Sequence, residues 1–261
     1  MLSIDLKGKI AIVTGASQGI GLGIAVMLAK AGCHIAGCAI TSEDSPKAQG
    51  FIKAVQETGQ KVMYKSLDIR FKDQIDDFVK EVQYKFGKID ILISNAGKNM
   101  FTKPELCEED FWNENSDLNL KSHWLISKAC KVELSKNNGV IIIMSSNHAF
   151  ATLPDCFPYN VTKAGLVGLV RSLALQWGSE IRVIGLAPGF IQTEGGDKWF
   201  DSFTNPQEKK QQIIDIHPLK RLGSVEDIGA FCSFLCSDYA NFITGTTYLV
   251  DGGRSAIMQD L

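Results

Sequence analysis

The sequence has little of what marks nucleic-acid-binding, membrane and metal-binding proteins. Lys and Arg number 27 against 29 Asp and Glu, for a formal net charge of −2, so no basic field attracts nucleic acid or anionic lipid. No apolar run approaches the roughly 18 residues that a membrane span needs. The seven cysteines form no Cys-x-x-Cys pair, and no nearby His or carboxylate pair completes a zinc set with Cys232 and Cys236. We expect a protein that binds a small molecule, with thiols in its core or on its surface rather than at a metal site.

Proline and targeting signals are also scarce. The chain has 7 Pro in 261 residues and no Pro-rich segment or linker. Charges interrupt residues 1–9 and no small-residue cleavage site follows, so no secretory signal is predicted. Because α/β units often reach about 250 residues as one domain, we expect a single cytoplasmic domain over residues 1–261.

Short apolar runs alternate with longer helical patterns along the whole chain. Val140-Ile-Ile-Ile-Met144, for example, is typical of a strand buried on both faces. This alternation requires parallel strands, right-handed crossovers and helices on both faces. It predicts an α/β doubly wound sheet of about seven strands in three layers, with ligands at the carboxyl ends of the strands. The predicted strands span residues 9–14, 33–39, 61–66, 89–94, 140–145, 181–187 and 246–250, and the predicted helices 19–31, 46–58, 72–86, 110–135, 159–178 and 225–237.

One stretch interrupts the alternation. Residues 190–222 hold Gly195-Gly196, two prolines, Trp199 and many charges, and no clear helical or strand period. Because this irregular segment leaves the sheet at the carboxyl end of a strand, we expect a mobile substrate lid. A surface excursion without function is the alternative.

A glycine-rich turn follows the first predicted strand and opens the first predicted helix. Gly15 permits a tight turn, Gly19 lets the backbone approach a pyrophosphate, and Gly21 allows the helix to pack on the strand. The helix N-terminus then faces the negative charge of the phosphates. Taken alone, the turn indicates a nucleotide only weakly, and a purely structural turn stays open.

Further motifs lie where predicted strands end. Asn95-Ala96-Gly97, Ser146 and Pro188-Gly189 each follow a strand. Tyr159 and Lys163 are i,i+4 neighbours at the start of a helix, so both side chains project from one face. A lone Tyr-x-x-x-Lys is common by chance. It becomes specific here because Ser146 precedes it at a strand end and the glycine-rich turn lies upstream.

Together these motifs resemble the short-chain dehydrogenase/reductase family, in its branch with a single Rossmann-type domain. The resemblance covers nearly the whole chain, although Ser94 replaces the commoner Asn and Gln18 stands where many NADP-dependent members have Arg. The matching positions are residues 14–21 for T-G-x-x-x-G-x-G, Asp68, Asn95-Ala96-Gly97, the tetrad Asn119, Ser146, Tyr159 and Lys163, Pro188-Gly189 with Ile191 and Thr193, and Asp251-Gly252-Gly253. The resemblance implies cofactor contacts from Gly15, Ser17, Gln18, Gly19, Ile20, Gly21, Ala39, Asp68, Ile69, Asn95, Ala96, Gly97, Tyr159, Lys163, Pro188, Gly189, Ile191 and Thr193.

The tetrad fits hydride transfer between a nicotinamide and a carbonyl or secondary alcohol. Charge that develops on the carbonyl oxygen must meet a proton, and Tyr159 is the expected donor. A free phenol has a pKa near 10, which the Lys163 ammonium and the positive nicotinamide are expected to lower. Ser146 is expected to hold the substrate oxygen. By resemblance, Lys163 also binds the ribose, and Asn119 kinks its helix and holds a water that relays protons to Lys163.

The choice between NAD and NADP depends on the end of the second strand. An acidic residue there would bind the ribose 2′-hydroxyl and repel a 2′-phosphate, but the position is Ala39. NADP(H) is therefore favoured over NAD(H). No Arg stands at position 18 or 40 to bind the phosphate, and Lys47 lies too far along the chain to be counted as its replacement.

The substrate is expected among the residues that follow strands four, five and six. Asn99, Asn147, His148 and Phe190 are the candidates, with His148 expected to face solvent or to be satisfied within the protein. A sugar, a polyol or a ketone is favoured. A 3-oxoacyl thioester is the alternative substrate, although no Lys or Arg cluster indicates an acyl-carrier partner. A non-enzymatic nucleotide-sensing regulator is the alternative function, which a degraded tetrad would favour.

The expected assembly also comes from the resemblance. Family members of this length commonly form homotetramers through two long helices, and the apolar residues in 124–134 and 166–175 suit that arrangement. The tail 254–261 is expected to pack across a subunit interface.

Overall fold

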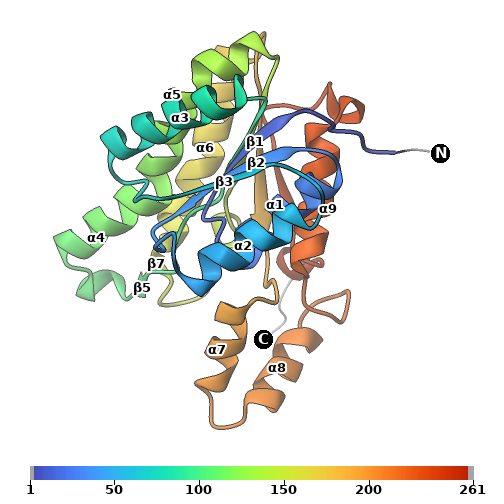
Figure 1. The fold of residues 1–261 in the computed structure, drawn as a ribbon. Helices are drawn as coiled ribbons and strands as arrows, with labels where there is room; N and C mark the ends of the chain where they lie inside the picture. Colours follow the sequence, from blue (N-terminus) through green and yellow to red (C-terminus); the bar gives the residue numbers. More distant parts are fainter. Residues whose placement is uncertain (1–2, 258–261) are drawn as a thin grey trace.

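The computed structural model describes residues 3–257, which build a seven-stranded parallel sheet between two helical layers (Figure 1). The strand order β3-β2-β1-β4-β6-β8-β9 turns back between β1 and β4. This order confirms the doubly wound sheet in three layers and places its switch point beside the first turn. The strands are β1 (Ile10–Thr14), β2 (His34–Ala39), β3 (Val62–Ser66), β4 (Ile91–Ser94), β6 (Val140–Met144), β8 (Arg182–Pro188) and β9 (Thr247–Val250).

The two helical layers bury opposite faces of the same strands. Along β1, Ala11 and Val13 face one core, and Ile10 and Ile12 face the other, because successive side chains of a strand point to opposite faces. Both faces are therefore apolar, which explains the uninterrupted hydrophobic runs. One layer holds α1 (Gly19–Lys30), α2 (Pro46–Gln56) and α9 (Val225–Cys236), and the other holds α3 (Lys72–Phe86), α5 (Ser122–Lys136) and α6 (Tyr159–Trp177).

The helix predicted over residues 110–135 is divided. The α4 helix (Glu109–Ser116) passes into α5 through a π-helical turn at Asp117–Lys121, and Asn119 lies within this turn. The helix is thus irregular at Asn119, where a kink was expected. A π-helical turn widens the helix locally and is often found at functional sites.

The segment expected to be irregular contains two helices. They are α7 (Glu194–Asp201) and α8 (Pro206–Asp215), which extend from the carboxyl side of the sheet (Figure 1). The expectation of irregular structure was wrong because side-chain caps start both helices: Thr193 accepts from the Gly196 amide, and Asn205 accepts from the Glu208 amide. We call residues 190–222 the α7–α8 segment.

A small antiparallel pair was not predicted. β5 (Phe101–Thr102) pairs with β7 (Phe157–Pro158), directly before α6. Strands of two residues leave no periodicity in a sequence, so only the folded chain reveals them. This pair brings residues 101 and 102 to the start of the helix that begins with Tyr159.

Cys232 and Cys236 are buried in α9 and belong to the core on the α1 side. Burial raises the pKa of both thiols, which keeps them protonated.

Within residues 3–257, no helix combines the length and the hydrophobicity needed to cross a membrane.

Candidate active site

The glycine-rich turn connects β1 to α1 at the switch point of the sheet. Gly15 and Gly19 have φ angles of +67° and +57°, which residues with side chains rarely adopt. The Gly15 amide donates to the Cys38 carbonyl at 2.7 Å. A Cβ at Gly21 would lie 2.2 Å from the Gly15 carbonyl oxygen and 2.7 Å from Asn95 Nδ2. Gly21 therefore lets the start of α1 lie close against Gly15 and Asn95, the residues that directly follow β1 and β4.

Asn95 and Ala96 fasten the end of β4 to the end of β1. Both backbone amides donate to Thr14 Oγ1 at 2.9 Å, and Asn95 Nδ2 donates to the Thr14 carbonyl, also at 2.9 Å. Thr14 is fully buried. These donors are therefore used within the protein. Their hydrogen bonds hold the loop after β4 against the end of β1, at the carboxyl edge of the sheet.

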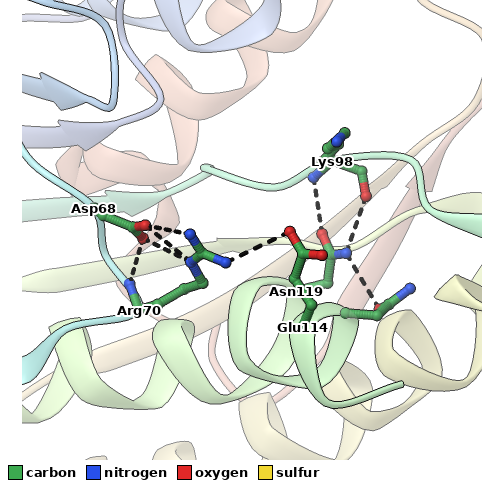
Figure 2. Close-up of polar contacts among 6 residues, drawn as sticks. Asp68, Arg70, Lys98, Glu114 and Asn119 are labelled. Atoms are coloured by element: carbon green, nitrogen blue, oxygen red, sulfur yellow. Dashed lines mark hydrogen bonds and ion pairs between the residues drawn. The ribbon is translucent and has the colours of Figure 1, made fainter. Parts of the chain in front are cut away.

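Asn119 pins the loop that follows Gly97. Its Oδ1 accepts from the Lys98 amide and its Nδ2 donates to the Lys98 carbonyl, both at 2.9 Å (Figure 2). The same Nδ2 donates to Asn115 Oδ1 at 3.2 Å. A Cβ at Gly97 would lie 2.8 Å from Asn119 Oδ1 and 3.5 Å from Lys163 Nζ, so Gly97 lies against both side chains.

We expect Asn119→Asp to destabilise the protein by about 2–4 kcal/mol. The carboxylate can still accept from the Lys98 amide, but it cannot donate to the Lys98 carbonyl or to Asn115, and its charge would be buried. Urea unfolding measures the change. Asn113→Asp, at an exposed position of α4, is the control. Equal stability of the two variants would contradict this account.

Tyr159, Lys163 and Ser146 come together at the carboxyl end of β6. Tyr159 is the first residue of α6, and Lys163 lies one turn later with Nζ 5.5 Å from the centre of the Tyr159 ring. Lys163 Nζ donates to the Met144 carbonyl at 3.0 Å. Ser146 Oγ accepts from the His148 amide at 3.2 Å. Tyr159, Lys163 and Ser146 are each more than nine-tenths buried.

Burial sets the protonation of this group. It raises the pKa of Tyr159 to about 12, against the opposite influence of the Ser146 hydroxyl. Burial also lowers the pKa of Lys163 to about 7. The lowering expected from Lys163 together with the positive nicotinamide is not produced by the protein's own groups alone. The reason is that both charged forms are poorly solvated in this site, so the phenol and the neutral amine are favoured.

Asp68, which follows β3, is held by an arginine that sequence reasoning missed. Arg70 Nη2 is 2.6 Å from Asp68 Oδ2, and the Arg70 amide donates to Asp68 Oδ1 at 2.9 Å. Partial burial alone would raise the pKa of Asp68, but Arg70 brings it below its usual value. Arg70 Nη1 also reaches Glu114 of α4 at 3.5 Å, so it links the end of β3 to α4 (Figure 2). The neighbouring Ile69 is buried in the core.

The segment that follows β8 lies next to the glycine-rich turn. Pro188 ends the strand, Gly189 follows it, and Ile191 is buried in the core on the α1 side. A Cβ at Gly19 would lie 3.5 Å from Thr193 Cγ2. The structure thus brings Thr193 and the glycine-rich turn together, although they are far apart in the sequence.

The residues around the end of β2 lie beside the glycine-rich turn. Ser17 is buried, and its Oγ lies 3.2 Å from Thr41 Oγ1. Ala39 is the last residue of β2 and is half-buried. Ile20 packs against the core, so its side chain faces away from the turn's open side.

Lys47 lies at this turn, contrary to the expectation from the sequence. It is the second residue of α2, and its Nζ donates to Oε1 of Gln18, the residue that precedes α1. The same Nζ is 3.4 Å from Glu194 Oε2 in α7. Distance along the chain was misleading because the β2–α2 loop folds back toward the end of β1.

His148 packs beside the tyrosine. Its ring centre lies 5.9 Å from that of Tyr159 and 6.0 Å from that of Phe101. Its Nδ1 lies 2.9 Å from Thr152 Oγ1, and burial lowers its pKa. His148 is thus satisfied within the protein rather than free in solvent. Phe101, whose ring meets Tyr159 edge to face at 5.2 Å, was missed because β5 has no signal in the sequence.

The remaining substrate candidates are dispersed. Asn147 follows Ser146 and begins a short 3₁₀ turn, while Asn99 is exposed in the loop after Gly97. Phe190 packs in the α7–α8 segment, with its ring centre 5.1 Å from that of Phe200. The structure therefore brings Asn147 close to the buried group and places Phe190 within the segment expected to form a lid.

Comparisons with known proteins show the family to which the chain belongs. Residues 15–255 match a family model described as enoyl-(acyl carrier protein) reductase. The chain is 34% identical over 252 residues to dehydrogenase/reductase SDR family member 4 of Homo sapiens, covering 95% of this chain and 88% of that protein. It is 35% identical over 247 residues to a 3-oxoacyl-[acyl-carrier-protein] reductase of Staphylococcus aureus, covering 94% and 97% of the two chains.

A solved structure gives the same result. A 7α-hydroxysteroid dehydrogenase in complex with NADH and 7-oxo glycochenodeoxycholic acid superposes with a TM-score of 0.87 at 32% identity, covering 96% of each chain. The likeness extends over the whole sheet and its helices, and the relatives are named as dehydrogenases and reductases. This chain belongs to the short-chain dehydrogenase/reductase family and is a nicotinamide-dependent oxidoreductase that acts on carbonyl or CH–OH groups.

Proposed function

We propose that the protein reduces an apolar ketone, with Tyr159 as the proton donor. The observation that carries this proposal is the buried group of Tyr159, Ser146 and Lys163 at the carboxyl end of β6. With a pKa of about 12, Tyr159 holds its proton throughout the neutral range and is ready to donate it. Ser146 positions the substrate oxygen, Lys163 binds the cofactor ribose, and Asn119 positions the loop at Gly97.

The residues at the switch point fit a dinucleotide. Gly15 and Gly19 leave their backbone without side chains, and Thr193 lies next to Gly19. Asp68, after β3, and the half-buried Ala39, at the end of β2, border the space expected for adenosine. We propose NADP(H) as the cofactor, because no carboxylate at Ala39 would repel a 2′-phosphate. When bound, the nicotinamide supplies the hydride.

Exposed apolar side chains beside Tyr159 and in the loop before α6 support an apolar ketone over a sugar or polyol. Phe101 and His148 lie against the Tyr159 ring, and Phe101 is 44% exposed. Phe150 and Leu153, in the loop before α6, are also about half exposed. A sugar needs polar partners for its hydroxyls, which Phe101, Phe150 and Leu153 do not provide. The lowered pKa of His148 keeps its ring neutral.

A second candidate is the reduction of a 3-oxoacyl thioester. The observation in its favour is the 35% identity to the Staphylococcus aureus reductase over 94% of this chain. The same tyrosine and serine would act on its 3-oxo group. A nucleotide-sensing regulator is disfavoured because all four tetrad residues are present.

Oxidation of NADPH and NADH with a substrate panel tests the proposal. The panel holds cyclic and aromatic ketones, a 3-oxoacyl thioester, an enoyl thioester and sugars. We expect the ketones to react at least about tenfold faster than the sugars, and Ser146→Ala to lower kcat about 100-fold. Ser179→Ala, at an exposed position in the turn after α6, is the control. Turnover of the enoyl thioester alone would contradict carbonyl reduction.

Assembly and location are further parts of the proposal. We propose a homotetramer in the cytoplasm, with α5 and α6 at subunit interfaces. Trp124 and Val132 of α5 and Leu175 of α6 are exposed, which supports contacts there. Leu134 and Leu166, in the same stretches, are buried in the protein's own core and contribute nothing to such a surface.

A further inference from the structure

The α4 helix presents a buried asparagine to three other segments. Asn115 lies in the last turn of α4 and is fully buried. Its Nδ2 donates to the Met100 carbonyl at 3.2 Å. Its Oδ1 accepts from Asn119 Nδ2 at 3.2 Å and from Thr162 Oγ1 at 3.1 Å. One side chain therefore joins the loop before β5, the π-helical turn and the first turns of α6.

Two of these three partners have a second hydrogen bond that does not depend on Asn115. Asn119 Nδ2 and Thr162 Oγ1 each donate also to a backbone carbonyl. The contact with Met100 differs because it connects α4 to β5, the strand that begins at the next residue. We therefore expect loss of the Asn115 side chain to act mainly on β5.

The α4 helix also contacts β7, the strand that pairs with β5. Trp112 lies one turn before Asn115 and packs on Phe157 of β7, with ring centres 5.4 Å apart. The helix therefore supports both strands of the β5–β7 pair. Phe101 of β5 meets the Tyr159 ring edge to face at 5.2 Å. The α4 helix thus lies behind the strand whose aromatic ring faces the proposed proton donor.

We propose that Asn115 and Trp112 are positioning residues, which hold the β5–β7 pair so that Phe101 and Tyr159 together fit a bulky ketone. The inference rests on the proposed function in taking a ketone as the substrate and Tyr159 as the proton donor. A bulky ketone contacts Phe101, so the place of its carbonyl beside the Tyr159 hydroxyl depends on that ring. A displacement of about 1 Å can lower a rate up to about 100-fold, because the reacting atoms lose their alignment. A small ketone does not reach Phe101 and does not depend on it.

Steady-state reduction of acetophenone and butanone with the preferred nicotinamide cofactor tests the inference. It compares wild type with Asn115→Leu, Trp112→Leu and a matched control, Asn113→Leu, at an exposed position of α4. We expect Asn115→Leu to lower kcat/KM about tenfold for acetophenone and less than about threefold for butanone. Trp112→Leu should act in the same direction by about threefold. The control should match wild type with both ketones.

A double-mutant cycle shows whether the effect of Asn115 acts through Phe101. In the Phe101→Leu background, Asn115→Leu should lower kcat/KM for acetophenone by less than about a further twofold, because the ring to be positioned is absent. Additive losses would overturn the inference. A change in cofactor affinity of more than about threefold would also overturn it, because the effect would then act through Asn119 and the loop after Gly97.

Hydrogen exchange measures the support of the β5–β7 pair without turnover. The amides of residues 101 and 102 should exchange at least about tenfold faster in Asn115→Leu, with those of β1 and β4 unchanged. Unchanged exchange at residues 101 and 102, or an unchanged ratio of acetophenone to butanone activity, would overturn the inference. If Asn115→Leu does not fold, Trp112→Leu supplies both measurements, because Trp112 is 37% exposed.

The outcomes separate this inference from the proposed function. Reduction of both ketones by the wild type with no selective loss in the variants would overturn the positioning role and leave ketone reduction intact. If the wild type reduces neither ketone, the proposed function fails. The exchange of residues 101 and 102 then supports or overturns the role of Asn115 by itself.

Discussion

Replacing Tyr159 with phenylalanine is expected to lower kcat for ketone reduction by about 10³-fold. The variant keeps the aromatic ring that packs edge to face against Phe101 and His148, so the site keeps its shape. It loses only the hydroxyl that donates the proton. Stopped-flow and steady-state absorbance of NADPH measure the effect, with NADPH affinity followed by fluorescence.

The control for this variant is Tyr84→Phe. Tyr84 lies in α3 and is 95% exposed, so removal of its hydroxyl should leave kcat unchanged. NADPH should bind Tyr159→Phe with an affinity within about threefold of wild type, because the substrate-side hydroxyl contributes little to cofactor binding. A kcat within about tenfold of wild type would show that another group supplies the proton.

The second large effect concerns stability. Lys163→Met is expected to raise the free energy of unfolding by about 2 kcal/mol at neutral pH, although it removes a proposed catalytic residue. The Lys163 ammonium is buried, and burial lowers its pKa from 10.5 to about 7. Methionine fills similar space without this cost. The lost hydrogen bond to the Met144 carbonyl offsets part of the gain.

The pH dependence follows from the direction of this shift. Between about pH 7 and 10.5, unfolded chains bind the Lys163 proton more than folded ones do, so this group makes wild-type stability rise with pH. Lys163→Met lacks this dependence. Its advantage should be largest at and below pH 7 and should shrink as the pH rises to 10.5. Lys53→Met, at an exposed position of α2, is the control. Urea unfolding of Lys163→Met parallel to wild type from pH 7 to 10 would contradict a buried, mostly neutral lysine.

The local patterns of the sequence were sufficient for the sheet and for part of the site. Apolar runs such as Val140–Met144 predicted strands buried on both faces, and the spacing of Tyr159 and Lys163 placed both on one helical face. The predicted helix over residues 110–135 was less accurate. At its division, Asn119 forms hydrogen bonds with the backbone of Lys98, a contact between different parts of the chain that helical spacing does not reveal.

By itself, the sequence determined the doubly wound fold, the family and the glycine-rich turn after the first strand, because periodicity, turn chemistry and helical spacing are local properties of the chain. Only the tertiary structure decided which loops meet at the carboxyl edge of the sheet. It brought Lys47 to Gln18 and Glu194, and Phe101 to Tyr159. It also decided how far burial raises the pKa of Tyr159, because desolvation depends on everything packed around a group and not on its neighbours in sequence.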